Sequence, residues 1–234
     1  MPEVILLAGG LGTRLRSVLQ DTPKCMAPVK GLPFLEYVMD YLLKWDVQRF
    51  ILAVGYKGDQ IVNYFGENYK NTPVVYSIED SPLGTGGGIL QALTFCRSST
   101  VLVLNGDTIF TINIRQLIDQ HHKSNAGMSI ALRKVDDISR YGEVIVDPNN
   151  KVIAFAEKHS QQRAGLINGG VYLIDHAVYK SVTPSAVFSL ENDLFPLLIQ
   201  DQLLFGFPSD GYFLDIGIPS DYLKAQNELK SLEY

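Results

Sequence analysis

Ala8-Gly-Gly-Leu-Gly-Thr-Arg-Leu15, followed by Pro23-Lys24, is the stretch that decides the fold class of this 234-residue chain. It comes directly after Val4-Ile-Leu-Leu7, a short apolar run typical of a buried strand. Three glycines in four positions let the backbone approach a ligand closely, with its N–H groups turned towards phosphate oxygens. Arg14 and Lys24 add positive charge beside them. The stretch predicts a site for a nucleoside triphosphate, formed by the two cations and by Leu7, Ala8, Gly9, Gly10, Gly12 and Thr13.

This glycine loop differs from both common phosphate-binding loops. A Walker loop ends in Gly-Lys-Ser/Thr, where this chain has Arg14-Leu15. A dinucleotide-binding loop needs a third glycine three residues after Gly12, and that position is Leu15. A plain glycine turn with two surface cations is the alternative interpretation, but the full string favours nucleotide binding.

The composition indicates a globular protein, and the length fits a single domain over 1–234. The net charge of −5 argues against non-specific nucleic-acid binding, so an anionic substrate needs a local cationic site. Cys25 and Cys96 lie far apart, which indicates neither a disulfide scaffold nor a zinc site. The chain shows no basic-plus-apolar leader and no apolar run of about 18 residues. We therefore expect a cytoplasmic protein that does not enter a membrane.

Apolar runs alternate with helical patterns in the first half of the chain, and closely spaced strands follow in the second half. Strands are expected at 3–7, 49–54, 73–77, 100–104, 128–133, 143–147, 151–156 and 168–174. Helices are expected at 34–44, 58–65, 86–96, 113–123, 191–200 and 219–232. The order predicts a Rossmann-like α/β fold with a mixed, mostly parallel sheet flanked by helices and a β insertion in its second half. Ligands of such sheets bind beyond the carboxyl ends of the strands.

A second glycine cluster, Ser81-Pro-Leu-Gly-Thr-Gly-Gly-Gly88, lies between the expected 73–77 strand and a helix. Gly84 would let a flat base lie against the backbone, with amide and carbonyl groups of the turn at its edge. Glu79 just upstream offers a carboxylate that could accept hydrogen bonds from the two edge donors of guanine. The cluster therefore predicts base-binding residues, namely Glu79, Pro82, Leu83, Gly84 and Thr85. A flexible turn is the alternative, and for Glu79 the two interpretations stay equally open.

A carboxylate closes the next apolar run, where Leu104-Asn-Gly-Asp-Thr108 follows the expected 100–104 strand. Asp107 at a strand end is unfavourable without a cation or hydrogen bonds to satisfy it. A capping role is the alternative. Asn105 and Gly106 precede it and are expected to line the nucleotide site.

Together these strings resemble the sugar-1-phosphate nucleotidyltransferase family, whose members have the nucleotide-diphospho-sugar transferase fold. The glycine loop with Lys24 resembles the family's signature loop, and Pro82-Leu-Gly-Thr85 its base-binding turn. Phe213-Leu-Asp-Ile-Gly-Ile-Pro-Ser-Asp-Tyr222 resembles the family's D-I-G-T-P motif. The resemblance implies that Asp107 and Asp215 hold Mg²⁺, a hard cation that takes carboxylate oxygens.

Three further strings extend the resemblance over roughly residues 3 to 222 and imply a sugar side formed by the β insertion. Arg140-Tyr-Gly-Glu143 resembles the family's R-Y-G segment, which places Tyr141 and Gly142 against the sugar. Phe155-Ala-Glu-Lys158 resembles its F-x-E-K segment, in which Glu157 would bind sugar hydroxyls and Lys158 the 1-phosphate. Ile167-Asn-Gly-Gly-Val-Tyr172 resembles its N-x-G-x-Y segment, with Asn168 and Gly169 at the sugar.

The resemblance implies attack by a sugar 1-phosphate oxygen on the α-phosphorus of a nucleoside triphosphate, with loss of pyrophosphate. Arg14 and Lys24 would be the catalytic residues, through charge neutralisation and positioning. The sequences of these segments are most similar to the branch of the family that uses GTP and D-glycero-α-D-manno-heptose 1-phosphate for surface glycans. Cys25 departs from the proline usual there, which would loosen the loop of Lys24. A homodimer is left open.

Other substrates and activities stay open as alternatives. Within the family these are transfer of GMP to mannose 1-phosphate, or of UMP to a hexose or N-acetylmuramate 1-phosphate. A GT-A glycosyltransferase would usually carry Asp-x-Asp, whereas this chain has Asn105-Gly-Asp107. A non-catalytic regulatory relative would be expected to lose the cations that this chain retains.

Overall fold

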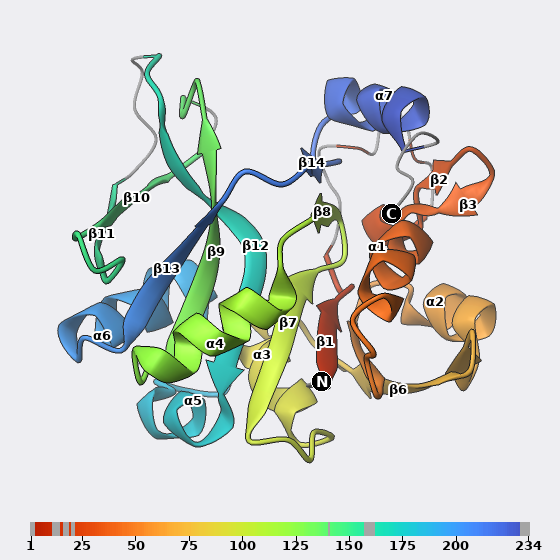
Figure 1. Ribbon diagram of the computed structural model, residues 1–234. Helices are drawn as coiled ribbons and strands as arrows, with labels where there is room; N and C mark the ends of the chain where they lie inside the picture. The colour runs from red at the N-terminus through yellow and green to blue at the C-terminus, as the bar shows by residue number, and fades with distance from the viewer. Residues whose placement is uncertain are drawn as a thin grey trace.

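The computed structural model describes residues 3–10, 15, 19, 22–139, 141–156 and 162–229. Across these ranges a ten-stranded mixed sheet runs through the molecule with helices on both of its faces (Figure 1). Its main path has the order β11-β10-β12-β7-β1-β4-β6-β5, with β9 paired to β12 and β13 paired to β9. The predicted α/β class with a mixed sheet is therefore confirmed. The assignment of 1–234 to one domain stays a prediction.

The nucleotide half of the sheet is parallel. Its strands are β1 (Val4–Leu7), β4 (Phe50–Val54), β6 (Thr72–Ile78) and β7 (Thr100–Asn105). In the parallel register Leu7 lies opposite both Ala53 and Asn105. Ser77 of β6 in turn lies opposite Ala53, so the carboxyl ends of four neighbouring strands meet near one level, where the two predicted glycine segments follow β1 and β6.

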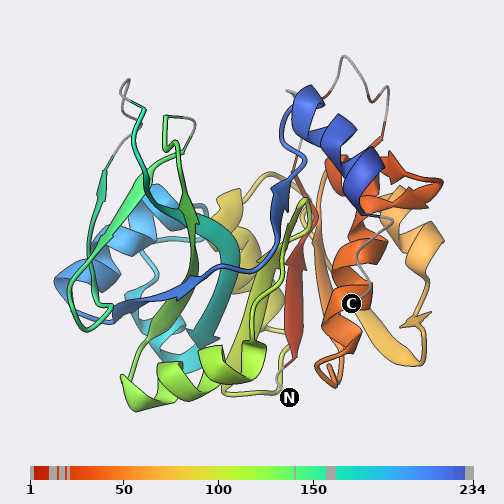
Figure 2. The same cartoon turned by 45° about the horizontal axis from the view of Figure 1, so that its top comes forward.

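The second half of the sheet is mostly antiparallel and stands to one side of the parallel strands (Figure 2). It comprises β9 (Met128–Val135), β10 (Glu143–Val146), β11 (Val152–Ala156), β12 (Gly165–Asp175) and β13 (Leu204–Ser209). Strand β12 is longer than the expected 168–174 and its pairing with β9 shifts register between Asn168 and Tyr172. The sequence analysis missed β13, which contains Gly206 and Pro208. Among the strands of the sheet, β13 pairs only with β9, and a single bridge between Phe205 and Lys151 lies on its other side, so Pro208 is in an edge position that tolerates proline.

The helices are α1 (Phe34–Leu43), α2 (Gly58–Phe65), α3 (Gly84–Leu93), α4 (Ile114–Lys123), α5 (His176–Val182), α6 (Phe195–Gln200) and α7 (Pro219–Glu228). Helix α5 was not predicted. Helix α3 was expected at 86–96, but it begins at Gly84 and ends at Leu93, since Phe95 and Cys96 donate to carbonyls three residues back. The expected 191–200 helix is a π-helix, η3 (Leu190–Leu194), that continues into α6. No helix in the described ranges is long and apolar enough to cross a membrane.

Short elements lie at both ends of the parallel strands, and several of them join distant parts of the chain. A 3₁₀ turn, η2 (Lys24–Met26), leads into the hairpin of β2 (Pro28–Val29) and β3 (Leu32–Pro33), and β5 (Asn68–Tyr69) borders β6. Strand β8 (Thr108–Phe110) pairs with β14 (Phe213–Asp215), and α7 follows directly beside β2 and β3 (Figures 1 and 2).

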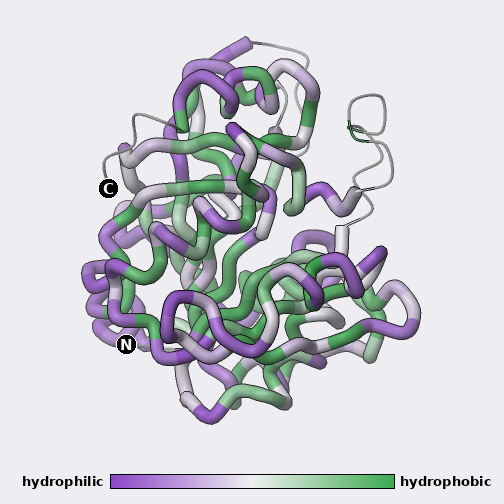
Figure 3. The backbone as a smooth tube through the Cα atoms, turned by 90° about the vertical axis from the view of Figure 1, so that its right-hand side faces the viewer, coloured by the Kyte–Doolittle hydropathy of each residue, from purple (hydrophilic) through white to green (hydrophobic). Residues whose placement is uncertain are grey.

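Two cores cover the two faces of the sheet. Side chains alternate along a strand, so Val4 and Leu6 pack on the face covered by α1 and α4, while Ile5 packs on the face covered by α3, α5 and α6. The backbone tube is accordingly hydrophobic along the central strands (Figure 3). Burial on both sides holds the ends of the parallel strands in place beneath the candidate site.

Candidate active site

Lys24, Asp107 and Asp215 form a charged cluster at the carboxyl end of the parallel strands. Lys24 Nζ donates to Asp107 Oδ2 at 2.5 Å and to Asp215 Oδ1 at 3.2 Å. The β8–β14 pairing places Asp215 opposite Thr108, and Ile216 N donates to Asp107 O at 3.1 Å. The structure therefore brings together one predicted catalytic cation and both predicted metal ligands.

Close backbone packing positions this cluster. Gly106 N donates to Leu7 O at 2.9 Å, and a Cβ on Gly106 would lie 2.8 Å from that oxygen. A Cβ on Gly217 would lie 3.0 Å from Asp215 Oδ1 and 3.3 Å from Lys24 Nζ. The sequence analysis missed Gly217, although the D-I-G string that contains it was the available signal. Glycine at both positions lets the backbone approach the charged side chains.

The electrostatics of the cluster favour a further cation. Burial would lower the pKa of Lys24, but the neighbouring Asp107 and Asp215 outweigh it and raise that pKa. Burial raises the pKa of Asp215, and Asp107 raises it further against the lowering effect of Lys24. Two carboxylates facing one ammonium carry a net negative charge, so the donor set suits a hard divalent cation. Within the described ranges, no group of three or more His, Cys, Asp and Glu side chains could hold a metal.

A cavity of about 330 Å³ opens beside the cluster and is bordered by both glycine segments. Most of the residues predicted to bind the nucleotide lie in its wall, together with Lys24 and Asp107. They are Leu7, Ala8, Gly9, Gly10, Glu79, Pro82, Gly84, Thr85 and Asn105. The predicted Leu83 and Gly106 are not among the described residues that line it. Each of the two instead donates its backbone N–H to a residue of the wall, Leu83 to Glu79 and Gly106 to Leu7.

Cys25 and Ala53 also line the cavity, and the sequence analysis did not predict them. Ala53 lies opposite Leu7 on β4, so only strand pairing reveals it. Cys25 is buried in the 3₁₀ turn, and its thiol donates to Ala8 O at 3.8 Å. Burial raises the pKa of this thiol to about 12, so it is neutral at physiological pH. Cys25 thus contacts the start of the glycine loop, and the expected loosening of the Lys24 loop stays a prediction.

The second glycine segment needs its glycines for close backbone packing. Gly84 has a φ of +73°, and a Cβ there would lie 2.5 Å from Phe188 O. Gly86 N donates to Phe188 O at 3.0 Å, and Phe188 N donates to Leu83 O at 3.0 Å. The segment is therefore a fixed platform at the cavity, not a free turn.

Glu79 makes a structural contact and also lies in the cavity wall. Its Oε2 accepts from Leu83 N at 3.2 Å, which braces the second glycine segment. Its Oε1 lies near the glycine loop, 3.6 Å from the position of a Cβ on Gly9. Burial raises the pKa of Glu79, while the bond from Leu83 N–H lowers it. Glu79 thus braces the second glycine segment at the cavity wall, and its role towards a base stays a prediction.

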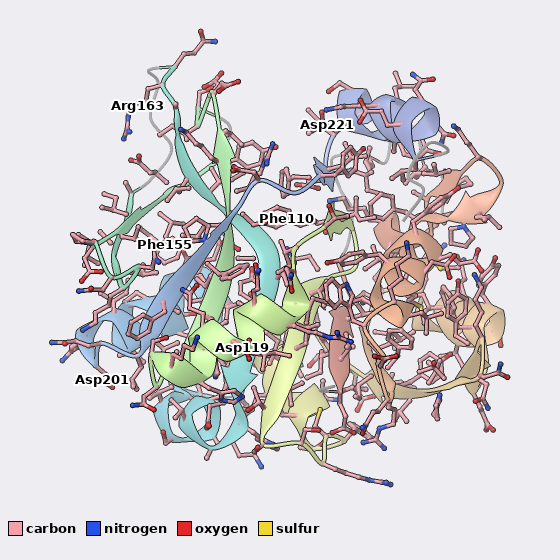
Figure 4. All side chains as sticks on the ribbon, in the orientation of Figure 1. Phe110, Asp119, Phe155, Arg163, Asp201 and Asp221 are labelled. Carbon is pink, nitrogen blue, oxygen red and sulfur yellow. The ribbon has the colours of Figure 1, made fainter. Side chains whose placement is uncertain are left out.

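Two of the predicted sugar residues, Asn168 and Gly169, lie on β12 in the antiparallel half of the sheet. Asn168 Nδ2 donates to Tyr172 Oη and to Glu191 Oε1, both at 2.9 Å, and its Oδ1 accepts from Gly170 N at 3.0 Å. Gly169 is buried against Phe110, which Figure 4 labels near β8.

Tyr141 of the predicted R-Y-G segment packs close to the same region. The rings of Tyr141 and Phe213 pack edge-on with their centroids 6.4 Å apart, and Phe213 lies two residues before Asp215. Gly142 follows Tyr141 and directly precedes β10. Gly12, Thr13, Arg14, Glu157 and Lys158 lie outside the described residues, so their predicted roles stay predictions.

Comparison with known proteins was made with the whole chain. A family model described as Nucleotidyl transferase matches residues 3–231. The chain is 44% identical over 230 residues to D-glycero-alpha-D-manno-heptose 1-phosphate guanylyltransferase of Aneurinibacillus thermoaerophilus, covering 97% of this chain and 98% of that protein. It is 41% identical over 223 residues to the protein of the same name from Campylobacter jejuni, covering 94% and 96%. The crystal structure of HddC from Yersinia pseudotuberculosis complexed with GMP-PN matches with a TM-score of 0.85 and 38% identity, covering 97% and 98%.

Proposed function

The chain belongs to the nucleotidyl transferase family, and we propose that it transfers GMP from GTP to D-glycero-α-D-manno-heptose 1-phosphate. The observation that carries the chemistry is the convergence of Lys24, Asp107 and Asp215 at a cavity bordered by both glycine segments. The guanine and heptose assignments are supported by the 44% and 41% identity to guanylyltransferases of that name.

The proposed reaction is an in-line displacement at the α-phosphorus of GTP. An oxygen of the sugar 1-phosphate forms the new bond to this phosphorus, and the bond to the bridging oxygen of the β-phosphate breaks. The products are GDP-sugar and pyrophosphate. Because the attacking oxygen is already anionic, the chain needs no general base, and rate enhancement comes from positioning and charge neutralisation.

The cations of this chain divide that task. Lys24, only 11% exposed, lies at the cavity wall, and it would contact the α-phosphate and the incoming phosphate together. Arg14 would neutralise the triphosphate, and Lys158 would hold the sugar 1-phosphate. Asp107 and Asp215 would hold Mg²⁺, whose charge, when bound, offsets that of the phosphates.

The base preference is assigned to Glu79. Its cavity-side oxygen would accept from the ring N–H and the exocyclic amino group of guanine, whereas uracil offers a single ring N–H. A site built to receive such donors discriminates strongly against a ligand that lacks one, by up to ~10⁴-fold. Transfer to mannose 1-phosphate and uridylyl transfer are the alternatives within the family. We further propose a cytoplasmic enzyme that supplies surface glycan synthesis.

A panel of the four common NTPs against heptose, mannose, glucose and N-acetylated hexose 1-phosphates tests this function, with pyrophosphate release as the readout. We expect GTP to exceed UTP and dTTP, and the heptose phosphate to exceed mannose 1-phosphate. Preference for UTP with a hexose phosphate would overturn the substrate assignment and leave the reaction type standing. Absence of pyrophosphate release from every pair would overturn the reaction type as well.

A further inference from the structure

A chain of polar side chains leads from the nucleotide cavity to an exposed carboxylate on the antiparallel half of the sheet. Asn105 lines the cavity, and its side chain lies close enough to Tyr172, a buried residue of β12, to lower the pKa of the Tyr172 hydroxyl against the larger effect of burial. Tyr172 Oη accepts from Asn168, which also donates to Glu191 Oε1 at 2.9 Å. Glu191 therefore belongs to the region of the predicted sugar residues, although it is 23 residues from Asn168 in sequence.

Among these polar side chains, Asn168 has its donors and its acceptor engaged, whereas Glu191 keeps acceptor sites open. Both amide hydrogens of Asn168 are donated within the protein, and its oxygen accepts from Gly170 N. An ionised carboxylate has about four acceptor sites, and Asn168 supplies the hydrogen bond to Glu191 that the described residues show. Glu191 is exposed, so its other acceptor sites are open to a ligand. Sugar hydroxyls are hydrogen-bond donors, and carboxylates are strong acceptors for them.

Glu191 is held by the backbone of a π-helix, an element frequent at functional sites. Leu190 N at the start of this helix donates to Thr85 Oγ1 at 3.0 Å, and Thr85 lines the nucleotide cavity. Two residues earlier, Phe188 O accepts from Gly86 N and Gly87 N at 3.0 and 3.3 Å. The backbone that carries Glu191 is therefore anchored on the base-binding segment.

We propose that Glu191 is a specificity-determining residue of the sugar side, and that its open carboxylate oxygens accept hydrogen bonds from hydroxyls of the sugar 1-phosphate. The inference rests on the proposed function and extends it, because it assigns the choice among polyhydroxylated sugar phosphates to an element anchored on the base-binding segment. Tyr172 lies within the electrostatic reach of both Glu191 and Asp107, since both carboxylates raise the pKa of its hydroxyl in addition to the effect of burial. Glu191 thus acts at the polar junction between sugar and phosphate chemistry.

Glu191→Ala and Glu191→Gln test the proposal, with Asn192→Ala as the matched control on the neighbouring exposed position of η3. For the better of heptose and mannose 1-phosphate, we expect Glu191→Ala to raise KM by ~10-fold or more, the loss typical of a hydrogen bond to a charged group. KM for GTP should change by less than ~2-fold. Asn192→Ala should leave both constants within ~2-fold of the wild type.

The Glu191→Gln variant separates recognition of the sugar from support of Asn168. The side-chain oxygen of the introduced glutamine would still accept from Asn168 Nδ2, so this variant would restore wild-type constants if Glu191 only oriented Asn168. We expect instead an intermediate KM and an altered ratio of kcat/KM between heptose and mannose 1-phosphates. Full rescue by glutamine would overturn the proposal.

Monodeoxy analogues of mannose 1-phosphate identify the contacted hydroxyl. For one analogue, the wild type should lose ~10-fold or more in kcat/KM, whereas Glu191→Ala should lose less than ~2-fold on the same change. Equal losses in both proteins at every position would overturn the proposal, even where the wild type performs the proposed reaction. A wild type inactive with every sugar phosphate would instead overturn the proposed function.

Discussion

Lys24 and Asp215 are 191 residues apart in the sequence, and a hydrogen bond of 3.2 Å joins their side chains. Helix α7 supports this contact from both sides, because it follows Asp215 and because Tyr222 Oη donates to Pro28 O, close after Lys24. Gln226 Nε2 donates to the same carbonyl at 2.7 Å. An early and a late segment of the chain thus meet at the point where the proposed chemistry takes place.

Removing either carboxylate of the cluster should abolish most of the activity. We expect Asp107→Ala or Asp215→Ala to lower kcat by at least ~10²-fold at saturating Mg²⁺, because the proposed metal supplies several kcal/mol of charge stabilisation. Initial rates of pyrophosphate release over a Mg²⁺ titration provide the measurement. Asp201→Ala, at an exposed carboxylate after α6, is the control and should behave as the wild type. Near-normal turnover in Asp107→Ala would show that the metal assignment is wrong.

Lys24 and Lys158 should affect different kinetic constants. Lys24→Ala should lower kcat with both substrates saturating, because its ammonium lies beside Asp107 at the cavity wall. Lys158→Ala should mainly raise KM for the sugar 1-phosphate. Steady-state kinetics with each substrate varied in turn separates the two effects. If both variants weakened GTP binding equally, this division of roles would be lost.

Glu79→Gln should weaken the preference for guanine. The carboxylate oxygen at the cavity would be replaced by an amide that can present a donor to the base edge, so KM for GTP should rise by ~10-fold or more. KM for UTP should change less. Competition between GTP and UTP gives the ratio directly, and a ratio unchanged from the wild type would assign Glu79 to bracing Leu83 alone.

Gly84→Ala should destabilise the protein more than a similar change at another left-handed glycine. Both Gly84 and Gly31 have positive φ, of +73° and +89°, but a Cβ on Gly31 would meet no atom within 4 Å. The Cβ on Gly84 would crowd Phe188 O, which adds at least ~1 kcal/mol of overpacking to the backbone strain. Urea unfolding of the two variants measures the difference. Equal losses would mean that the Phe188 carbonyl moves without resistance.

The Cys25 thiol should make stability fall at alkaline pH. Burial raises its pKa from an ordinary 9.0 to about 12. Between these values the folded state keeps a proton that the unfolded state loses, so the free energy of unfolding falls as the pH rises. The fall should approach about 1.4 kcal/mol per pH unit for this group.

Urea unfolding of the parent and of Cys25→Ala, both carrying Cys96→Ala, checks this between about pH 8 and 10.5. The second substitution removes the other cysteine, whose pKa burial also raises to about 12. The stability advantage of Cys25 should shrink over this range as the unfolded thiol ionises. A constant difference between the two proteins would argue that the thiol is not buried and protonated.

Local patterns predicted most elements because they reflect forces that act over a few residues. The apolar runs of β1, β4 and β7 and the glycine segments that follow them were readable, since strand burial and close ligand approach each demand particular residue types. The same patterns missed β13, which contains Pro208. An edge strand accepts proline, whereas a central strand does not.

By itself, the sequence determined the fold class and the family, predicted phosphate binding by the first loop, and singled out Lys24, Asp107 and Asp215. The tertiary structure alone decided that these three side chains meet, that Ala53 and Cys25 join the cavity wall, and that Glu191 stands beside Asn168. The physical reason is that motifs record what each short segment can bind, whereas their meeting depends on strand register and on contacts such as Leu190 with Thr85. Those contacts join segments far apart in the chain, and no local pattern encodes their partners.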